Sequence, residues 1–161
     1  EGERVPSDTQ FEGSGETMLW KKQILVGYGQ RSNKNIKAAL EKTFNLPVVA
    51  LELIDPKYYH LDTALFPIND NYIAVYEAAF SEEAKKVIRS LDAEILYLNE
   101  TSALAFALNS ISINNTIVLY YKADQFRKQL EKLNFDVLSL DVSEFIKFGG
   151  GLKCLTFQHY L

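Results

Sequence analysis

Cysteine and histidine are scarce in this chain of 161 residues, which contains one cysteine and two histidines. A single cysteine cannot form an internal disulfide, and it is compatible with a reducing compartment. The cysteine and the histidines lie too far apart in the sequence to give the ligand spacing of a zinc site. We therefore expect no metal site and no cofactor, and a cytoplasmic location.

Long apolar runs and clusters of basic residues are missing as well. No apolar stretch reaches the length of about 20 residues that a membrane span requires. The net charge is −4 and the lysines are scattered among acidic residues, so no basic stripe could follow a phosphate backbone. We expect neither a membrane nor a nucleic acid as a partner.

The remaining composition is typical of one ordinary globular domain. Hydrophobic residues make up 47% of the sequence and charged residues 24%. Residues 1–9 form a lead-in without a periodic pattern. Residues 10–161 are predicted to form a single α/β domain of three units, which span about residues 10–54, 55–100 and 101–158.

Each unit shows the same order of patterns, with two paired strands, a helix and a closing strand. The helices are predicted to begin near residues 33, 81 and 123. Ser32 or Asn33 could cap the first helix, and Ser81 the second, whose buried face would include Val87 and Ile88. Repeats of about 40 to 50 residues stack on one another, because one such unit cannot bury its apolar face alone.

The second unit carries an imidazole and a carboxylate two residues apart. The run from Tyr58 to Phe66 is predicted to be a strand, and a strand would place His60 and Asp62 on the same face. A surface strand with a satisfied histidine explains the pattern equally well. The other histidine, His159, is interpreted as part of the C-terminal tail.

The lone cysteine follows three consecutive glycines. Gly149–Gly151 can adopt positive φ and allow a close approach to Cys154, which would suit a reactive group. Cys154 could also be a small buried hydrophobe. Glu12 lies in another glycine-broken segment, where it could bind a cation or simply face water.

These residue types together indicate a site for a cation. A cysteine nucleophile needs a partner that takes its proton, and a histidine steered by a carboxylate is the usual arrangement. Carboxylates around such a nucleophile would attract a positively charged substrate. A planar guanidinium fits, because carboxylates bind it in bidentate fashion.

Four segments of the chain form an ordered set of motifs: Phe11–Glu16, Gly27–Ser32, Tyr59–Thr63 and Gly149–Cys154. In this order they resemble the guanidino-group-modifying enzymes, which include arginine deiminases, dimethylarginine dimethylaminohydrolases and glycine amidinotransferases. The resemblance implies the pentein fold, a five-bladed α/β propeller of ββαβ units. The three units would be the C-terminal blades three to five, and we expect either a further N-terminal half before Glu1 or a homo-oligomer.

The resemblance implies a catalytic role for three residues. Cys154 would attack the guanidinium carbon and form a covalent thiouronium-type adduct. His60 would protonate the departing amine and later activate water, and Glu12 would pair with His60 and the guanidinium nitrogens.

Three further residues would bind the substrate by the same resemblance. Asp62 would grip the guanidinium, Arg31 would bind the substrate carboxylate, and Asn109 would lie near the site. Animal-type dimethylarginine hydrolases carry a lysine at the position of Asp62, so the acid here favours an unmethylated guanidine such as arginine. Glu16 stands where the family more often has aspartate.

The expected function is therefore a cysteine-dependent hydrolase that acts on the guanidino group of arginine or a related small guanidine. Hydrolysis of a methylated arginine and amidino transfer to an amine would use the same residues. A non-catalytic pentein fragment that acts as a binding or interaction module would also retain these motifs.

Overall fold

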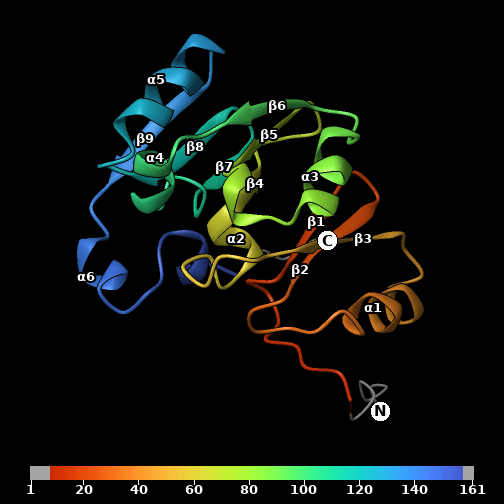
Figure 1. The fold of residues 1–161 in the computed structure, drawn as a ribbon. Helices are drawn as coiled ribbons and strands as arrows, with labels where there is room; N and C mark the ends of the chain where they lie inside the picture. The colour runs from red at the N-terminus through yellow and green to blue at the C-terminus, as the bar shows by residue number, and fades with distance from the viewer. Residues whose placement is uncertain (1–7, 158–161) are drawn as a thin grey trace.

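The computed structural model describes residues 8–157, which form an α/β fold with three small mixed sheets that follow one another along the chain (Figure 1). In each sheet, the first two strands are antiparallel and the third lies parallel to the second. The strands are β1 (Thr17–Trp20), β2 (Gln23–Tyr28) and β3 (Val48–Glu52); β4 (Leu65–Pro67), β5 (Tyr72–Val75) and β6 (Glu94–Tyr97); and β7 (Ile111–Ile113), β8 (Thr116–Tyr120) and β9 (Asp136–Leu140).

A helix connects the two parallel strands of each sheet, as a parallel crossover requires. These helices are α1 (Ile36–Phe44), α3 (Glu82–Arg89) and α5 (Asp124–Lys132). Shorter helical segments are α2 (Leu61–Ala64), α4 (Glu100–Leu104), α6 (Ser143–Ile146) and the 3₁₀ turns η1 (Glu77–Ala79) and η2 (Lys153–Leu155). The longest helices in the described range have nine residues, too few to cross a bilayer.

Strand β5, the central strand of the middle sheet, is buried on both faces. Ile73 and Val75 of β5 belong to an apolar cluster shared with Leu25 of β2, whereas Ala74 belongs to a second cluster shared with Ile117 of β8. This division follows from the alternation of side chains along a strand. Consecutive sheets therefore stabilise one another through shared cores.

The start of α3 shows how local sequence determines an element. The Ser81 hydroxyl accepts a hydrogen bond from the backbone N–H of Ala84 at 3.3 Å, which confirms Ser81 as the predicted cap. Ala84 and Ile88 form the buried stripe. The prediction for Val87 was wrong, since its side chain is 37% exposed.

Two other predictions are corrected. The run 58–66 is not one strand, because residues 61–64 form the helical turn α2 and only Leu65 begins β4. All four residues of α2 are buried, and the Asp62 N–H donates to the Gly15 carbonyl at 3.0 Å, a contact from the first unit that local periodicity cannot reveal. Helix α1 begins at Ile36, so neither Ser32 nor Asn33 is its N-cap.

Candidate active site

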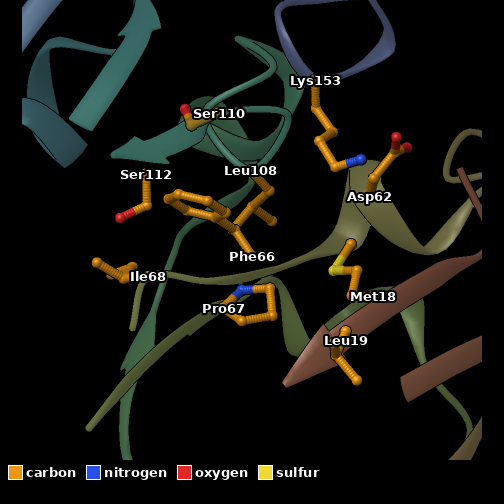
Figure 2. A pocket seen from close by; sticks show the side chains of 10 residues that line it. All are labelled: Met18, Leu19, Asp62, Phe66, Pro67, Ile68, Leu108, Ser110, Ser112 and Lys153. Atoms are coloured by element: carbon orange, nitrogen blue, oxygen red, sulfur yellow. The ribbon is translucent and has the colours of Figure 1, made fainter. Parts of the chain in front are cut away.

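Asp62 lies at one end of a pocket of about 160 Å³ between the first strands of the three sheets (Figure 2). The residue is 2% exposed, and this burial raises the pKa of the carboxyl to about 6. The Lys153 side chain points toward Asp62 in Figure 2, and its positive charge acts in the opposite direction on that pKa. The Asp62 Oδ1 atom is buried and forms no hydrogen bond with the described residues, so its capacity to accept one is unsatisfied.

Cys154 lies within η2, where its sulfur faces Asp62 and Asn109. The thiol donates to Asp62 Oδ2 at 3.7 Å, and Asn109 Nδ2 donates to the sulfur at 3.3 Å. Although the residue as a whole is exposed, desolvation around the sulfur, together with the nearby Asp62 charge, raises the pKa of the thiol. The resting side chain is therefore a neutral thiol at neutral pH.

Asn109 is almost fully buried and holds the cysteine segment at two points. Its Oδ1 accepts a hydrogen bond from the Cys154 N–H at 3.3 Å, while its Nδ2 also donates to the Asp62 carbonyl at 3.3 Å. A side chain on Gly151 would place its Cβ atom 2.7 Å from Asn109 Oδ1. Gly151 is therefore required for this close packing.

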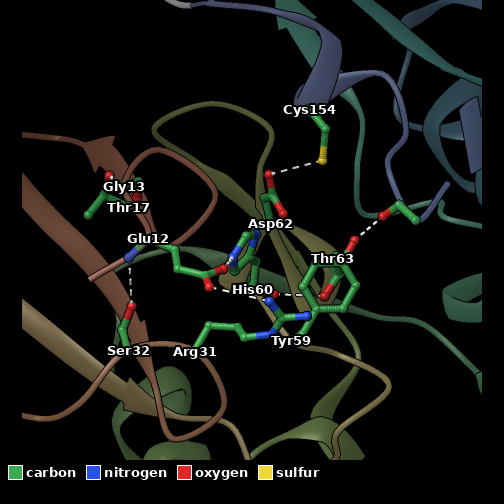
Figure 3. A network of polar contacts seen from close by, with 11 residues as sticks. Glu12, Gly13, Thr17, Arg31, Ser32, Tyr59, His60, Asp62, Thr63 and Cys154 are labelled. Carbon is green, nitrogen blue, oxygen red and sulfur yellow. Dashed lines mark hydrogen bonds and ion pairs between the residues drawn. The ribbon is translucent and has the colours of Figure 1, made fainter. Parts of the chain in front are cut away.

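His60 forms the centre of a second group of polar contacts (Figure 3). His60 Nε2 lies 2.8 Å from Glu12 Oε2, and Arg31 Nη1 donates to Glu12 Oε1 at 3.3 Å. The hydrogen bond to His60, and the nearby Arg31, hold the pKa of Glu12 below its usual value. Ser32, which was predicted as a helix cap, instead accepts a hydrogen bond from the Glu12 N–H at 3.3 Å.

The structure thus brings the six predicted residues into two adjoining groups. His60 and Asp62 are close in sequence but face different partners, Glu12 and Cys154, because the segment is a helical turn and not a strand. His159 lies outside the described residues.

One contact and one buried carboxylate were not predicted from the sequence. Tyr59 donates a hydrogen bond from its hydroxyl to the Gly149 carbonyl, and nothing in the sequence indicated this contact. Glu16 is completely buried, neither of its carboxylate oxygens forms a hydrogen bond with the described residues, and this burial raises its pKa. The signals in the sequence were its place in a glycine-rich motif and the aspartate that the family more often has at this position.

Comparison with known proteins agrees with the recognition of these motifs. Residues 4–161 match the family described as N,N-dimethylarginine dimethylhydrolase, eukaryotic. The chain is 37% identical over 147 residues to N(G),N(G)-dimethylarginine dimethylaminohydrolase of Mycobacterium tuberculosis, which covers 91% of this chain and 49% of that relative. It is 32% identical over 158 residues to the bifunctional arginine dihydrolase/ornithine cyclodeaminase AgrE of a Nostoc species, covering 96% of this chain and 22% of that protein.

The fold is similar to that of a solved enzyme domain. The N-terminal domain of ArgZ, a cyanobacterial arginine dihydrolase crystallised with product, aligns with a TM-score of 0.90 and 31% identity, over 95% of this chain and 57% of that one. The chain thus spans about half the length of the Mycobacterium relative and of this domain. The chain belongs to the N,N-dimethylarginine dimethylhydrolase family, within the guanidino-group-modifying enzymes of the pentein superfamily.

Proposed function

We propose that the protein hydrolyses the guanidino group of arginine by covalent catalysis through Cys154. The observation that carries this proposal is the position of the Cys154 sulfur, 3.7 Å from the buried carboxylate of Asp62. A carboxylate lowers the reactivity of a neighbouring thiol toward neutral substrates, because it opposes thiolate formation. The same carboxylate binds a guanidinium, whose central carbon is then held beside the sulfur.

Binding of the cation changes the electrostatics of the thiol. The positive charge of the guanidinium offsets that of the Asp62 carboxylate and lowers the pKa of Cys154, which is raised in the resting site. The nucleophile is then formed only when the substrate is present. An electrophile other than the substrate therefore encounters a neutral thiol, which is a weaker nucleophile than the thiolate.

The reaction proceeds in two stages. As the guanidinium binds, the Cys154 thiol gives its proton to water, the sulfur bonds to the guanidinium carbon, and the departing amine leaves with a proton donated by the imidazolium of His60. Water then transfers a proton to His60 and adds to the carbon of the thiouronium adduct. The carbon–sulfur bond breaks, the sulfur regains a proton, and the ureido product is released. Glu12 stabilises the protonated imidazole at each stage, through the contact at 2.8 Å.

Arg31 is proposed to bind the α-carboxylate of the substrate. Its guanidinium lies next to the site and its side chain is 53% exposed, so that it can form a bidentate pair with an incoming carboxylate. Asn109 positions the nucleophile through its contacts with both the N–H and the sulfur of Cys154.

A second candidate substrate is a methylated arginine. The family match and the 37% identity to a dimethylarginine dimethylaminohydrolase favour it. Arginine is preferred because Asp62 presents an acid that pairs best with a guanidinium that keeps all its N–H donors. An amidinotransferase would form a covalent adduct on the same cysteine and pass it to an amine in place of water.

The propeller fold, and the way in which further units would complete it, are also proposals. A cavity of about 540 Å³ opens on the first unit, and its lining includes large exposed apolar residues: Leu19, Phe44 and Phe157. We propose that further ββαβ units of the same fold cover this surface and close a five-unit propeller. Alternatively, a second copy of the chain covers this surface. Light scattering and the intact mass of the native protein distinguish the two possibilities. A free thiol in the site agrees with a cytoplasmic location.

The test is turnover by the native protein with arginine, asymmetric dimethylarginine and agmatine, measured as ureido product and released amine. Cys154→Ser should abolish turnover, and His60→Gln should lower kcat by about 10²-fold or more. Ser81→Ala, which alters only a helix cap away from the site, is the matched control. Full activity in Cys154→Ser would refute the mechanism. Release of dimethylamine in preference to ammonia would show that the substrate is the methylated arginine and not arginine.

A further inference from the structure

Tyr59 contacts three parts of the site that lie far apart in the sequence. Its hydroxyl donates to the carbonyl of Gly149, at the start of the glycine run before Cys154. The centroid of its ring lies 4.9 Å from the centroid of the His60 ring, in an edge-to-face arrangement, and 5.5 Å from the guanidinium carbon of Arg31. Figure 3 shows Arg31 extended alongside this ring. None of the roles assigned above uses Tyr59.

The segment that the Tyr59 hydroxyl contacts is the glycine run Gly149–Gly151, which has no side chains of its own to stabilise its position. Gly149 has φ of +89°, a conformation that favours glycine, and its N–H donates to the Ile146 carbonyl at 2.9 Å, within the turn that follows α6. The bond from Tyr59 connects this turn to the segment that carries His60. Together with the contacts of Asn109, it therefore helps to fix how the cysteine segment lies relative to the catalytic histidine.

The ring of Tyr59 restricts a long and exposed side chain. Arg31 would otherwise be held in the described structure by its contact of 3.3 Å with Glu12, which the substrate carboxylate would have to share. An aromatic face attracts a guanidinium without using its N–H donors. The N–H donors of Arg31 that do not contact Glu12 then remain free for a carboxylate.

We propose that Tyr59 is a positioning residue with two separable actions: its hydroxyl holds the Cys154 segment in place, and its ring orients Arg31 toward the substrate carboxylate. Burial of the phenol, and the nearby Cys154 and Asp62, raise the pKa of Tyr59, so that the hydroxyl remains a donor at neutral and mildly alkaline pH. The kinetic part of this proposal rests on the proposed function, whereas the hydroxyl contact does not.

Two substitutions separate the actions. Tyr59→Phe removes the hydroxyl and keeps the ring, while Tyr59→Leu removes both. The matched control is Tyr58→Phe, because the neighbouring Tyr58 hydroxyl is buried and forms no hydrogen bond with the described residues. Thermal melting of all three variants establishes that each is folded at the assay temperature.

The first measurement is the rate of alkylation of Cys154 by iodoacetamide, which requires no turnover. In Tyr59→Phe the released segment should let the sulfur move away from Asp62, and alkylation should become at least about threefold faster than in the unaltered protein and in Tyr58→Phe. An unchanged rate would refute the action of the hydroxyl. This result stands even if the unaltered protein hydrolyses no guanidine, an outcome that would refute only the proposed function.

The second measurement compares arginine with agmatine, which lacks the α-carboxylate. Tyr59→Phe should lower kcat about tenfold for both compounds with little change in KM, because it displaces the nucleophile and not Arg31. Tyr59→Leu should in addition raise KM about threefold for arginine alone. An equal rise in KM for agmatine would refute the action of the ring on Arg31.

Discussion

Lowering the pH from 8 to 5 should weaken the binding of arginine about tenfold, because it protonates Asp62. The carboxyl is 2% exposed and burial raises its pKa to about 6. At pH 8 nearly every molecule carries the Asp62 charge, whereas at pH 5 only about one in eleven does, a difference of about 1.4 kcal/mol in binding free energy. Glu12 should not contribute in this range, since its pKa is lowered and it remains charged.

The assay is isothermal titration of arginine into Cys154→Ser, in which neither turnover nor a thiol interferes. The plot of log Kd against pH should bend near pH 6. The double variant with Asp62→Asn should bind weakly at pH 8 and show no bend. A constant affinity between pH 5 and 8, or the same bend in the absence of Asp62, would refute the assignment of the guanidinium to this carboxylate.

Three further predictions concern two residues beside the site, Gly15 and Glu16, and one away from it, Ser81. Gly15→Ala would place a Cβ atom 2.4 Å from His60 Nδ1, so the imidazole must move and kcat should fall about 10²-fold without loss of the fold, as measured by steady-state kinetics and circular dichroism. Burial raises the pKa of Glu16, so the stability that its protonated form contributes is present below pH 4.5 and lost as pH rises through the native pKa. Glu16→Gln should remove this loss of stability, which is measured as the melting temperature between pH 4 and 8. Melting temperatures that change with pH in parallel in Glu16→Gln and the unaltered protein would contradict this prediction. Ser81→Ala removes the bond to Ala84 and should cost about 1 kcal/mol in unfolding free energy, measured in urea, with unchanged kcat and KM.

The sequence by itself determined the order of paired strands, helix and closing strand in each unit. Hairpin patterns, the cap at Ser81 and the stops after the helices depend on residues close together in the chain, and these local preferences survive in the structure. The class of reaction could also be predicted from the sequence, because a cysteine, a histidine and carboxylates in this motif order are compatible with few reactions.

Only the tertiary structure decided the geometry of the site. The turn α2 forms where Gly15, from the first unit, accepts from Asp62, and it separates the partners of His60 and Asp62 that a strand would have kept together. Desolvation decided the rest: Asp62 and the Cys154 sulfur, 92 residues apart in the chain, have raised pKa values because the fold excludes water around them. Burial of a charged group depends on which distant segments surround it, and no local pattern carries that information.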